Sequence, residues 1–108
     1  MTDYLLIESR DPFEFRDIVF RADLARRLAD TGNRVTIFLV QNGVLPARAG
    51  AGSAVLPLLA QAGVEIFADD FSLRERGISS ERLQPGIKPC AIDLVIDRLA
   101  EGAKVIWH

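Results

Sequence analysis

The sequence predicts a three-layer α/β/α sandwich built around a parallel sheet of five strands. Short apolar runs alternate along the chain with longer segments whose apolar residues recur every three or four positions. This alternation is typical of a parallel sheet with helices on both faces. The run at 35–40 is almost continuously apolar, as expected for a strand that is covered on both faces. The chain has 108 residues, so we expect one domain over 1–108.

The first strand and the first helix are predicted from the amino-terminal third of the chain. A short apolar run at 4–7 predicts the strand, and the helix is expected over 11–31. Asp11 and Glu14 form an acidic capping box at the start of this helix. Its buried face is predicted from apolar residues at helical spacing: Phe15, Ile18, Val19, Ala22, Ala25, Leu28 and Ala29.

The middle of the chain predicts a strand, a loop and a second helix. The strand at 34–40 is the strongest in the sequence. The segment at 44–52 is expected to be a loop because it contains Gly50 and Gly52. The second helix is expected over 53–62.

The third strand is predicted at 64–68 and is followed by two adjacent acids, Asp69 and Asp70. A second capping box at 72–75 predicts a short helix after these acids. Asp70 is expected to cap this helix, because the helix dipole favours a negative charge at its amino end.

The last quarter of the chain predicts an edge strand, a helix and a final strand. Ile87 is expected to belong to the short edge strand, and the helix is expected to run from Pro89 to about 101. The final strand is predicted at 104–107. The inner face of the helix is predicted to consist of four apolar residues: Ile92, Val95, Ile96 and Leu99.

Polar residues follow three of the predicted strands. Ligands bind in parallel sheets at the crevice beyond the carboxyl ends of the strands, and right-handed connections place these ends on one edge. The predicted binding crevice consists of Ser9, Arg10, Gln41, Asn42, Asp69 and Asp70. Turns attract the same residue types for backbone reasons, so an ordinary set of turns remains the alternative.

The paired acids also suggest a divalent cation, with Glu8 as a third oxygen ligand. Receiver domains use acids at the ends of their first and third strands in this way. They also need an adjacent acid pair after the first strand and a lysine after the last one, and this sequence has neither. We therefore predict no metal and no cofactor.

Cys90 is the only cysteine of the chain, so it cannot form an internal disulfide. It follows Pro89 at the predicted start of the last helix. Reactive thiolates occur in such positions, because amide groups of the first helical turn stabilise their charge. A single cysteine is more often a small buried apolar residue, and the only histidine, His108, is distant in sequence. Cys90 is a candidate thiol, but burial is the favoured interpretation.

The composition excludes several classes of partner. The net charge is −2 and the basic residues form no stripe, so we expect no nucleic acid partner. No apolar run is long enough for a membrane span, and the first residues lack the pattern of a signal peptide. A cytoplasmic location is therefore expected. Trp107 is expected to be packed or covered by another subunit.

The chain resembles the DsrE/DsrF/DsrH-like family, which includes the sulfur-relay subunits of the Tus complex. The matching segments are YLLIES, LARRLADTGNRVTIFLV, the turn QNGV and LLAQAGVEIFADDFSLRERGI. The resemblance covers the chain from Tyr4 to about Ile78 and is looser beyond. It implies a small α/β/α sandwich that assembles as a trimer or hexamer, either of one chain or mixed with DsrE-like subunits.

Active members of the family carry sulfur as a persulfide on a cysteine just after the third strand. The resemblance places Asp69 at that position, and a carboxylate cannot hold a persulfide. It thus implies an oligomeric protein associated with intracellular sulfur relay or sulfur oxidation that is a non-carrier or divergent member. Two alternatives remain open: a module that binds a small molecule or a divalent metal in the acidic crevice, and an enzyme in which Asp69 is an acid or base.

Overall fold

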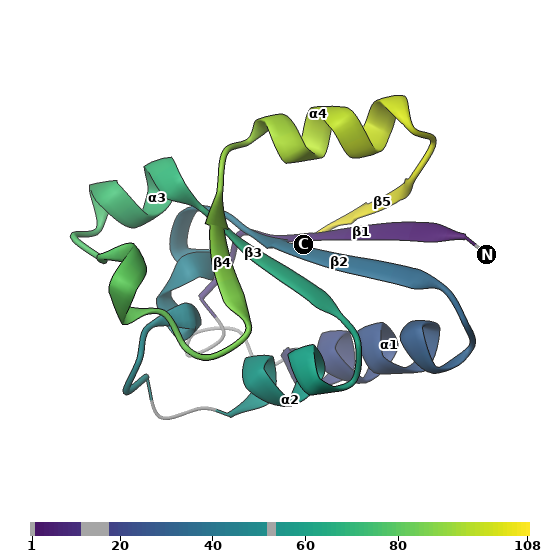
Figure 1. The fold of residues 1–108 in the computed structure, drawn as a ribbon, viewed down its shortest axis with the longest axis horizontal. Helices are drawn as coiled ribbons and strands as arrows, with labels where there is room; N and C mark the ends of the chain where they lie inside the picture. Colours follow the sequence, from purple (N-terminus) through teal and green to yellow (C-terminus); the bar gives the residue numbers. More distant parts are fainter. Residues whose placement is uncertain (1, 12–17, 52–53) are drawn as a thin grey trace.

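The computed structural model describes residues 2–11, 18–51 and 54–108, and it confirms the predicted α/β fold (Figure 1). Five parallel strands form one sheet in the order β4-β3-β2-β1-β5. The strands are β1 (Asp3–Glu8), β2 (Arg34–Leu39), β3 (Glu65–Asp69), β4 (Ile87–Cys90) and β5 (Lys104–Trp107). The short edge strand predicted around Ile87 is therefore present as β4.

Helices cover both faces of the sheet. Among the described residues the helices are α1 (Ile18–Asp30), α2 (Val55–Gln61), α3 (Asp70–Glu75) and α4 (Asp93–Ala100). In Figure 1, α1 and α2 lie below the sheet and α4 lies above it, while α3 extends beyond the end of β3. Two short 3-10 segments, η1 (Gln41–Ala47) and η2 (Ser80–Arg82), complete the described elements.

The core is divided into two apolar layers by the sheet, because successive side chains of a strand point to opposite faces. In β1, Leu6 belongs to the larger cluster, which includes Ala25 of α1. Its neighbours Leu5 and Ile7 belong to the smaller cluster, where Val95 of α4 packs. The sheet is thus buried on both faces, as its nearly continuous apolar strands indicate.

Two elements predicted in the middle of the chain differ from the structure. The predicted loop at 44–52 begins instead as η1, which occupies Gln41–Ala47. The second helix starts at Val55 rather than at 53, and it accommodates Pro57 because amide groups of a first helical turn need no partner within the helix.

The first helix is described only from Ile18 onward. Glu14 of the predicted capping box and the buried face predicted at 15–19 fall outside the described side chains. The remaining predicted face residues pack in the larger core cluster: Ala22, Ala25, Leu28 and Ala29.

The inner face predicted for the last helix is largely wrong. Only Val95 of the four predicted residues points toward the sheet, whereas Ile92, Ile96 and Leu99 are exposed. The helix also starts at Asp93 rather than at Pro89. The side of α4 that faces the sheet instead carries Leu94, Val95 and the buried Arg98, whose guanidinium lies 3.7 Å from Glu65 Oε2.

Glu65 also binds a second arginine at the amino ends of β2 and β3. Arg34 Nε donates to Glu65 Oε1 at 2.7 Å. This hydrogen bond lowers the pKa of the Glu65 carboxyl, and the nearby positive charges of Arg34 and Arg98 act in the same direction. The network therefore links α4 and two strands at the edge opposite to the predicted crevice.

Candidate functional site

Asp69 ends β3 and caps α3. Its carboxylate is buried, with the residue only 5% exposed, and Oδ2 accepts hydrogen bonds from Ser72 N at 3.0 Å and Ser72 Oγ at 2.6 Å. The predicted cap, Asp70, is instead the first helical residue, and its carboxylate lies 3.8 Å from Arg74 Nη1. The predicted capping box at 72–75 is likewise wrong, since the helix starts two residues earlier. Asp69 is the N-cap of α3, because its backbone is extended, as an N-cap requires.

Ser72 links Asp69 to the end of β2. Gln41 N donates to Ser72 Oγ at 2.9 Å, so this hydroxyl accepts from Gln41 and donates to Asp69. Gln41 is the one described non-glycine residue with positive φ, at 55°. Beside it, Asn42 Oδ1 accepts from Arg76 Nε at 3.2 Å and Nη2 at 3.0 Å. Three predicted crevice residues, Gln41, Asn42 and Asp69, thus belong to one group at the ends of β2 and β3.

Ser9 belongs to a second group at the ends of β1 and β5. Its hydroxyl donates to the His108 carbonyl at 3.0 Å and accepts from Trp107 Nε1 at 3.2 Å. Arg10 follows as an exposed residue. The two groups meet where Gly43 packs against the backbone of Ser9. The structure therefore divides the predicted residues between two adjacent groups, each with its own hydrogen bonds.

Glu8 anchors a buried charged cluster that the sequence analysis did not recognise. Arg21 Nε donates to Glu8 Oε1 at 2.7 Å, and His108 Nδ1 lies 3.2 Å from Glu8 Oε2. Arg21 Nη2 is buried and has no hydrogen-bond partner among the described residues. The helical spacing could have revealed Arg21, since position 21 follows Ile18 by three residues and precedes Ala25 by four, on the face that the sequence predicts to be buried.

Cys90 lies beside Asp69 and not at the start of a helix. It is the last residue of β4, and the strand register pairs it directly with Asp69. Its partly buried side chain packs in the smaller core cluster, together with Phe67 and Val95. The only thiol of the chain is therefore a spatial neighbour of Asp69, the residue at which the family resemblance places the carrier cysteine.

Metal ligation receives no support from the described residues. Over 2–11, 18–51 and 54–108, no group of three His, Cys, Asp or Glu side chains is arranged to hold a metal ion. Glu8, the expected third ligand, directs both carboxylate oxygens to Arg21 and His108 instead.

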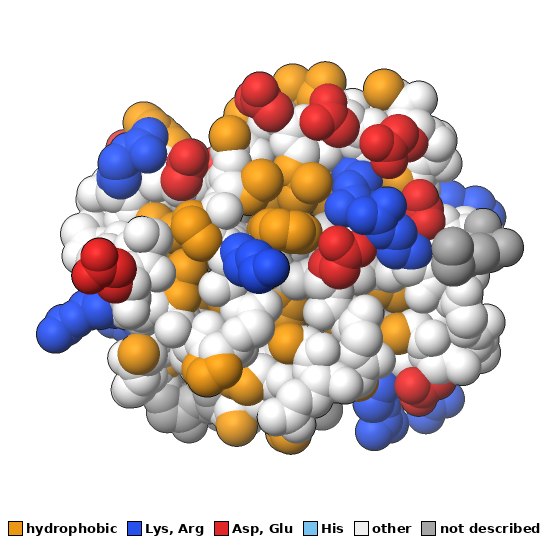
Figure 2. Space-filling model, viewed as in Figure 1, with side chains coloured by type: hydrophobic (Ala, Val, Ile, Leu, Met, Phe, Trp, Pro, Cys, Tyr) orange, Lys and Arg blue, Asp and Glu red, His pale blue; other side chains and the backbone are white. Residues whose placement is uncertain are grey.

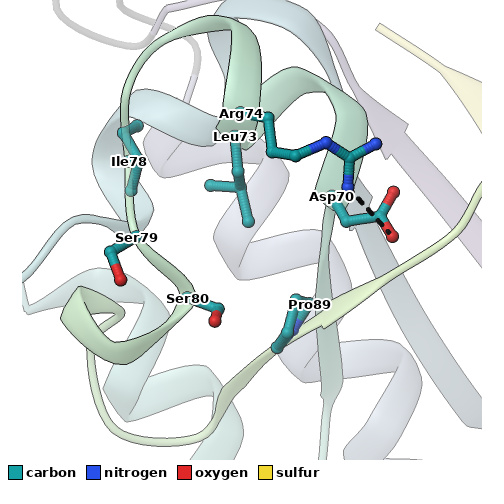
Figure 3. A pocket seen from close by; sticks show the side chains of 7 residues that line it. All are labelled: Asp70, Leu73, Arg74, Ile78, Ser79, Ser80 and Pro89. Atoms are coloured by element: carbon teal, nitrogen blue, oxygen red, sulfur yellow. Dashed lines mark ion pairs between the residues drawn. The ribbon is translucent and has the colours of Figure 1, made fainter.

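A pocket opens beside the acidic turn, between α3, the segment after it and β4. Its volume is about 350 Å³. Asp70 is the only predicted crevice residue in its lining, which consists of Asp70, Leu73, Arg74, Ile78, Ser79, Ser80 and Pro89 (Figure 3). This pocket is therefore offset from the predicted crevice toward α3 and β4.

Comparison with known proteins identifies the chain. The model of the DsrE/DsrF-like family matches residues 6–108, nearly the whole sequence. The chain belongs to the DsrE/DsrF-like family. No curated protein matches it significantly. Membership in the family associates the chain with sulfur relay in general, and proteins of this family form oligomers.

Solved structures show the same fold across the whole DsrE-like chain. The chain is similar to the ychN protein from E. coli, with a TM-score of 0.89, 17% identity and 100% of both chains covered. It is similar to MTH1491, a protein of unknown function from Methanobacterium thermoautotrophicum, with a TM-score of 0.81 and 22% identity over 99% of this chain and 98% of that one. For BT1422 from Bacteroides thetaiotaomicron, also of unknown function, the TM-score is 0.79 and the identity 20%, over 98% and 94% of the two chains.

In the described residues, no helix is long and apolar enough to span a membrane.

Proposed function

We propose that this DsrE-like protein takes part in cytoplasmic sulfur relay or sulfur oxidation as a non-carrier subunit. The observation that supports this is the buried capping role of Asp69. The family resemblance places the persulfide cysteine at this position. The Asp69 carboxylate instead uses one oxygen to accept two hydrogen bonds from Ser72. A carboxylate oxygen cannot form a persulfide, and here it serves to start α3.

The capping carboxylate preserves the shape of the turn after β3. Hydrogen bonds to a charged acceptor are stronger than those between neutral groups. The Ser72 hydroxyl that donates to Asp69 also accepts from Gln41 N, so the ends of β2 and β3 remain fixed together. A partner that recognises this edge would meet an ordered surface, which suits a subunit that positions other carriers.

Reactivity of Cys90 tests whether the remaining thiol is available. We expect the native protein to react with a soluble thiol reagent at least about tenfold more slowly than the urea-unfolded protein, because packing limits access to a partly buried thiol. Absorbance or mass spectrometry measures both rates. Equal rates in the two states would show an accessible thiol and argue against the non-carrier role.

The outer side of α4 supports the oligomeric part of the proposal. Ile92, Ile96 and Leu99 form an exposed apolar stripe at helical spacing, and Trp107 on the edge strand β5 is 67% exposed. Figure 2 shows hydrophobic side chains along the top of α4, above a row of acidic ones. Apolar residues gathered in this way mark protein interaction sites. We propose that this stripe contacts another DsrE-like subunit in a trimer or hexamer.

Substitution of Ile96 by aspartate tests this contact. We expect wild type to sediment as a trimer or hexamer and Ile96→Asp to sediment as a smaller species, because a charge buried in an apolar contact is costly. Leu58→Asp on α2 is the matched control, since Ile96 and Leu58 are both 61% exposed. A wild-type monomer at micromolar concentration, or equal assembly of both variants, would contradict the proposed contact.

A second candidate function is binding of a small molecule at the acidic edge. One observation favours it: Asp70 lines the pocket beside α3. This candidate involves no covalent sulfur chemistry, so it is compatible with a non-carrier protein.

A further inference from the structure

The α3 pocket combines charged, hydroxyl and apolar groups in a small volume. Its size of about 350 Å³ lies at the lower end of the range for small-molecule sites, about 300–1,000 Å³. Figure 3 shows Arg74 reaching across the pocket's upper side toward Asp70, with Ser79 and Ser80 on the opposite side. A ligand of this pocket must therefore be small and must satisfy groups on both sides.

The two charged side chains are only weakly engaged with each other. Arg74 Nη1 and Asp70 Oδ2 are 3.8 Å apart, and both side chains are substantially exposed. Exposed ion pairs of this kind contribute little to stability. Separating Asp70 from Arg74 therefore costs little free energy when a ligand supplies a new partner to each of them.

The rest of the lining is apolar apart from two hydroxyl groups. Leu73 is a buried core residue, and Ile78 and Pro89 lie on either side of it in the pocket wall (Figure 3). Ser79 Oγ accepts a hydrogen bond from Glu81 N at 3.3 Å. This wall suits a short apolar side chain.

The charge of the lining restricts the ligand further. A ligand with only a negative charge would be attracted by Arg74 but repelled by Asp70. A ligand with only a positive charge would be attracted by Asp70 but repelled by Arg74. A molecule that carries an ammonium and a carboxylate on neighbouring atoms satisfies both residues at once. We propose that the α3 pocket binds a free α-amino acid with an apolar side chain.

In this arrangement the ammonium group lies at Asp70, the carboxylate at Arg74 and the apolar side chain against Leu73, Ile78 and Pro89. The inference goes beyond the sulfur role and requires no sulfur transfer. The binding test also involves no sulfur transfer. Its result therefore does not depend on whether the non-carrier proposal is right.

The test is a calorimetric or NMR titration of the full chain with L-leucine. We expect saturable binding with one site per chain. Two analogues each lack one charge of L-leucine: 4-methylpentanoate lacks the ammonium and 3-methylbutylamine lacks the carboxylate. Each is expected to bind at least about tenfold more weakly, because it loses one charge-assisted contact. Glycine is expected to bind more weakly than L-leucine because it lacks the apolar side chain.

Variants of the pocket locate the binding site. We expect Asp70→Asn and Arg74→Gln each to weaken L-leucine binding at least about tenfold while the circular dichroism spectrum is retained. Asp23→Asn is the matched control, because Asp23 and Arg27 form the corresponding exposed pair, spaced i,i+4, on α1. The control is expected to bind L-leucine like wild type.

Three outcomes would overturn the proposal. The first is no saturable binding of L-leucine by the folded wild-type chain. The second is equal binding of L-leucine and its singly charged analogues. The third is unchanged binding in both Asp70→Asn and Arg74→Gln.

Discussion

Replacing Gly43 with alanine is expected to destabilise the protein by about 3 kcal/mol, because the site has no room for a methyl group. A Cβ atom at this position would lie 2.0 Å from Glu8 O and 2.8 Å from Glu8 C. These are backbone atoms, and Glu8 O already accepts a hydrogen bond from Val40 N at 2.9 Å, so it cannot move away freely. The free energy of unfolding in urea measures the loss.

Gly32→Ala is the control for this prediction. Gly32 has a φ of 87°, which disfavours alanine, but a Cβ atom there would meet nothing within 4 Å. We expect a loss of about 1–2 kcal/mol from backbone strain alone. Equal losses in the two variants would show that the close approach between η1 and β1 is unimportant for stability.

Replacing Glu8 with alanine is expected to cost about 3–5 kcal/mol, because it leaves a buried arginine without its carboxylate. The Arg21 and Glu8 side chains are only 11% and 10% exposed, and Nε and Oε1 are 2.7 Å apart. Within the described part of the chain, Arg21 Nη2 has no hydrogen-bond partner, so no described group at this nitrogen compensates for the loss. Urea unfolding, with circular dichroism of the native state, measures the effect.

Arg34→Ala is the matched comparison for the Glu8 variant. The pair of Arg34 and Glu65 has the same atoms at the same 2.7 Å separation, but its side chains are 40% and 38% exposed. Solvent screens this pair, so we expect a loss of about 1 kcal/mol or less. A small effect of Glu8→Ala, comparable to that of Arg34→Ala, would mean that the buried cluster is not structurally important.

The fold could be predicted from the sequence because its signals are local. Apolar runs identified the strands, and the alternation of strands with helical spacing determined the layers. The orientation of α4 could not be obtained in this way, because its apolar residues occupy more than one side of the helix. The side that faces the sheet includes Arg98, which contacts Glu65, and the spacing of apolar residues does not predict that contact.

The candidate site was harder to predict because it depends on contacts between strands. The acids after β3 were recognised, but which of them caps α3 depends on backbone conformation, and the extended residue is Asp69. The position of Cys90 beside Asp69 follows from the pairing of β3 with β4. These residues are twenty-one positions apart in sequence, and no local pattern specifies that pairing.

The measurement that tests the non-carrier role most directly is sulfur loading of the native protein. The wild-type chain and Cys90→Ser are incubated with a small-molecule persulfide donor, freed of it, and weighed as intact proteins by mass spectrometry. We expect neither chain to gain a sulfur atom, because our proposal assigns the carrier position to Asp69, whose carboxylate accepts from Ser72, and because the Cys90 thiol packs in the smaller core cluster with Val95 of α4. A gain of sulfur in wild type that is absent from Cys90→Ser would contradict this, and would show that the neighbouring strand supplies the carrier thiol.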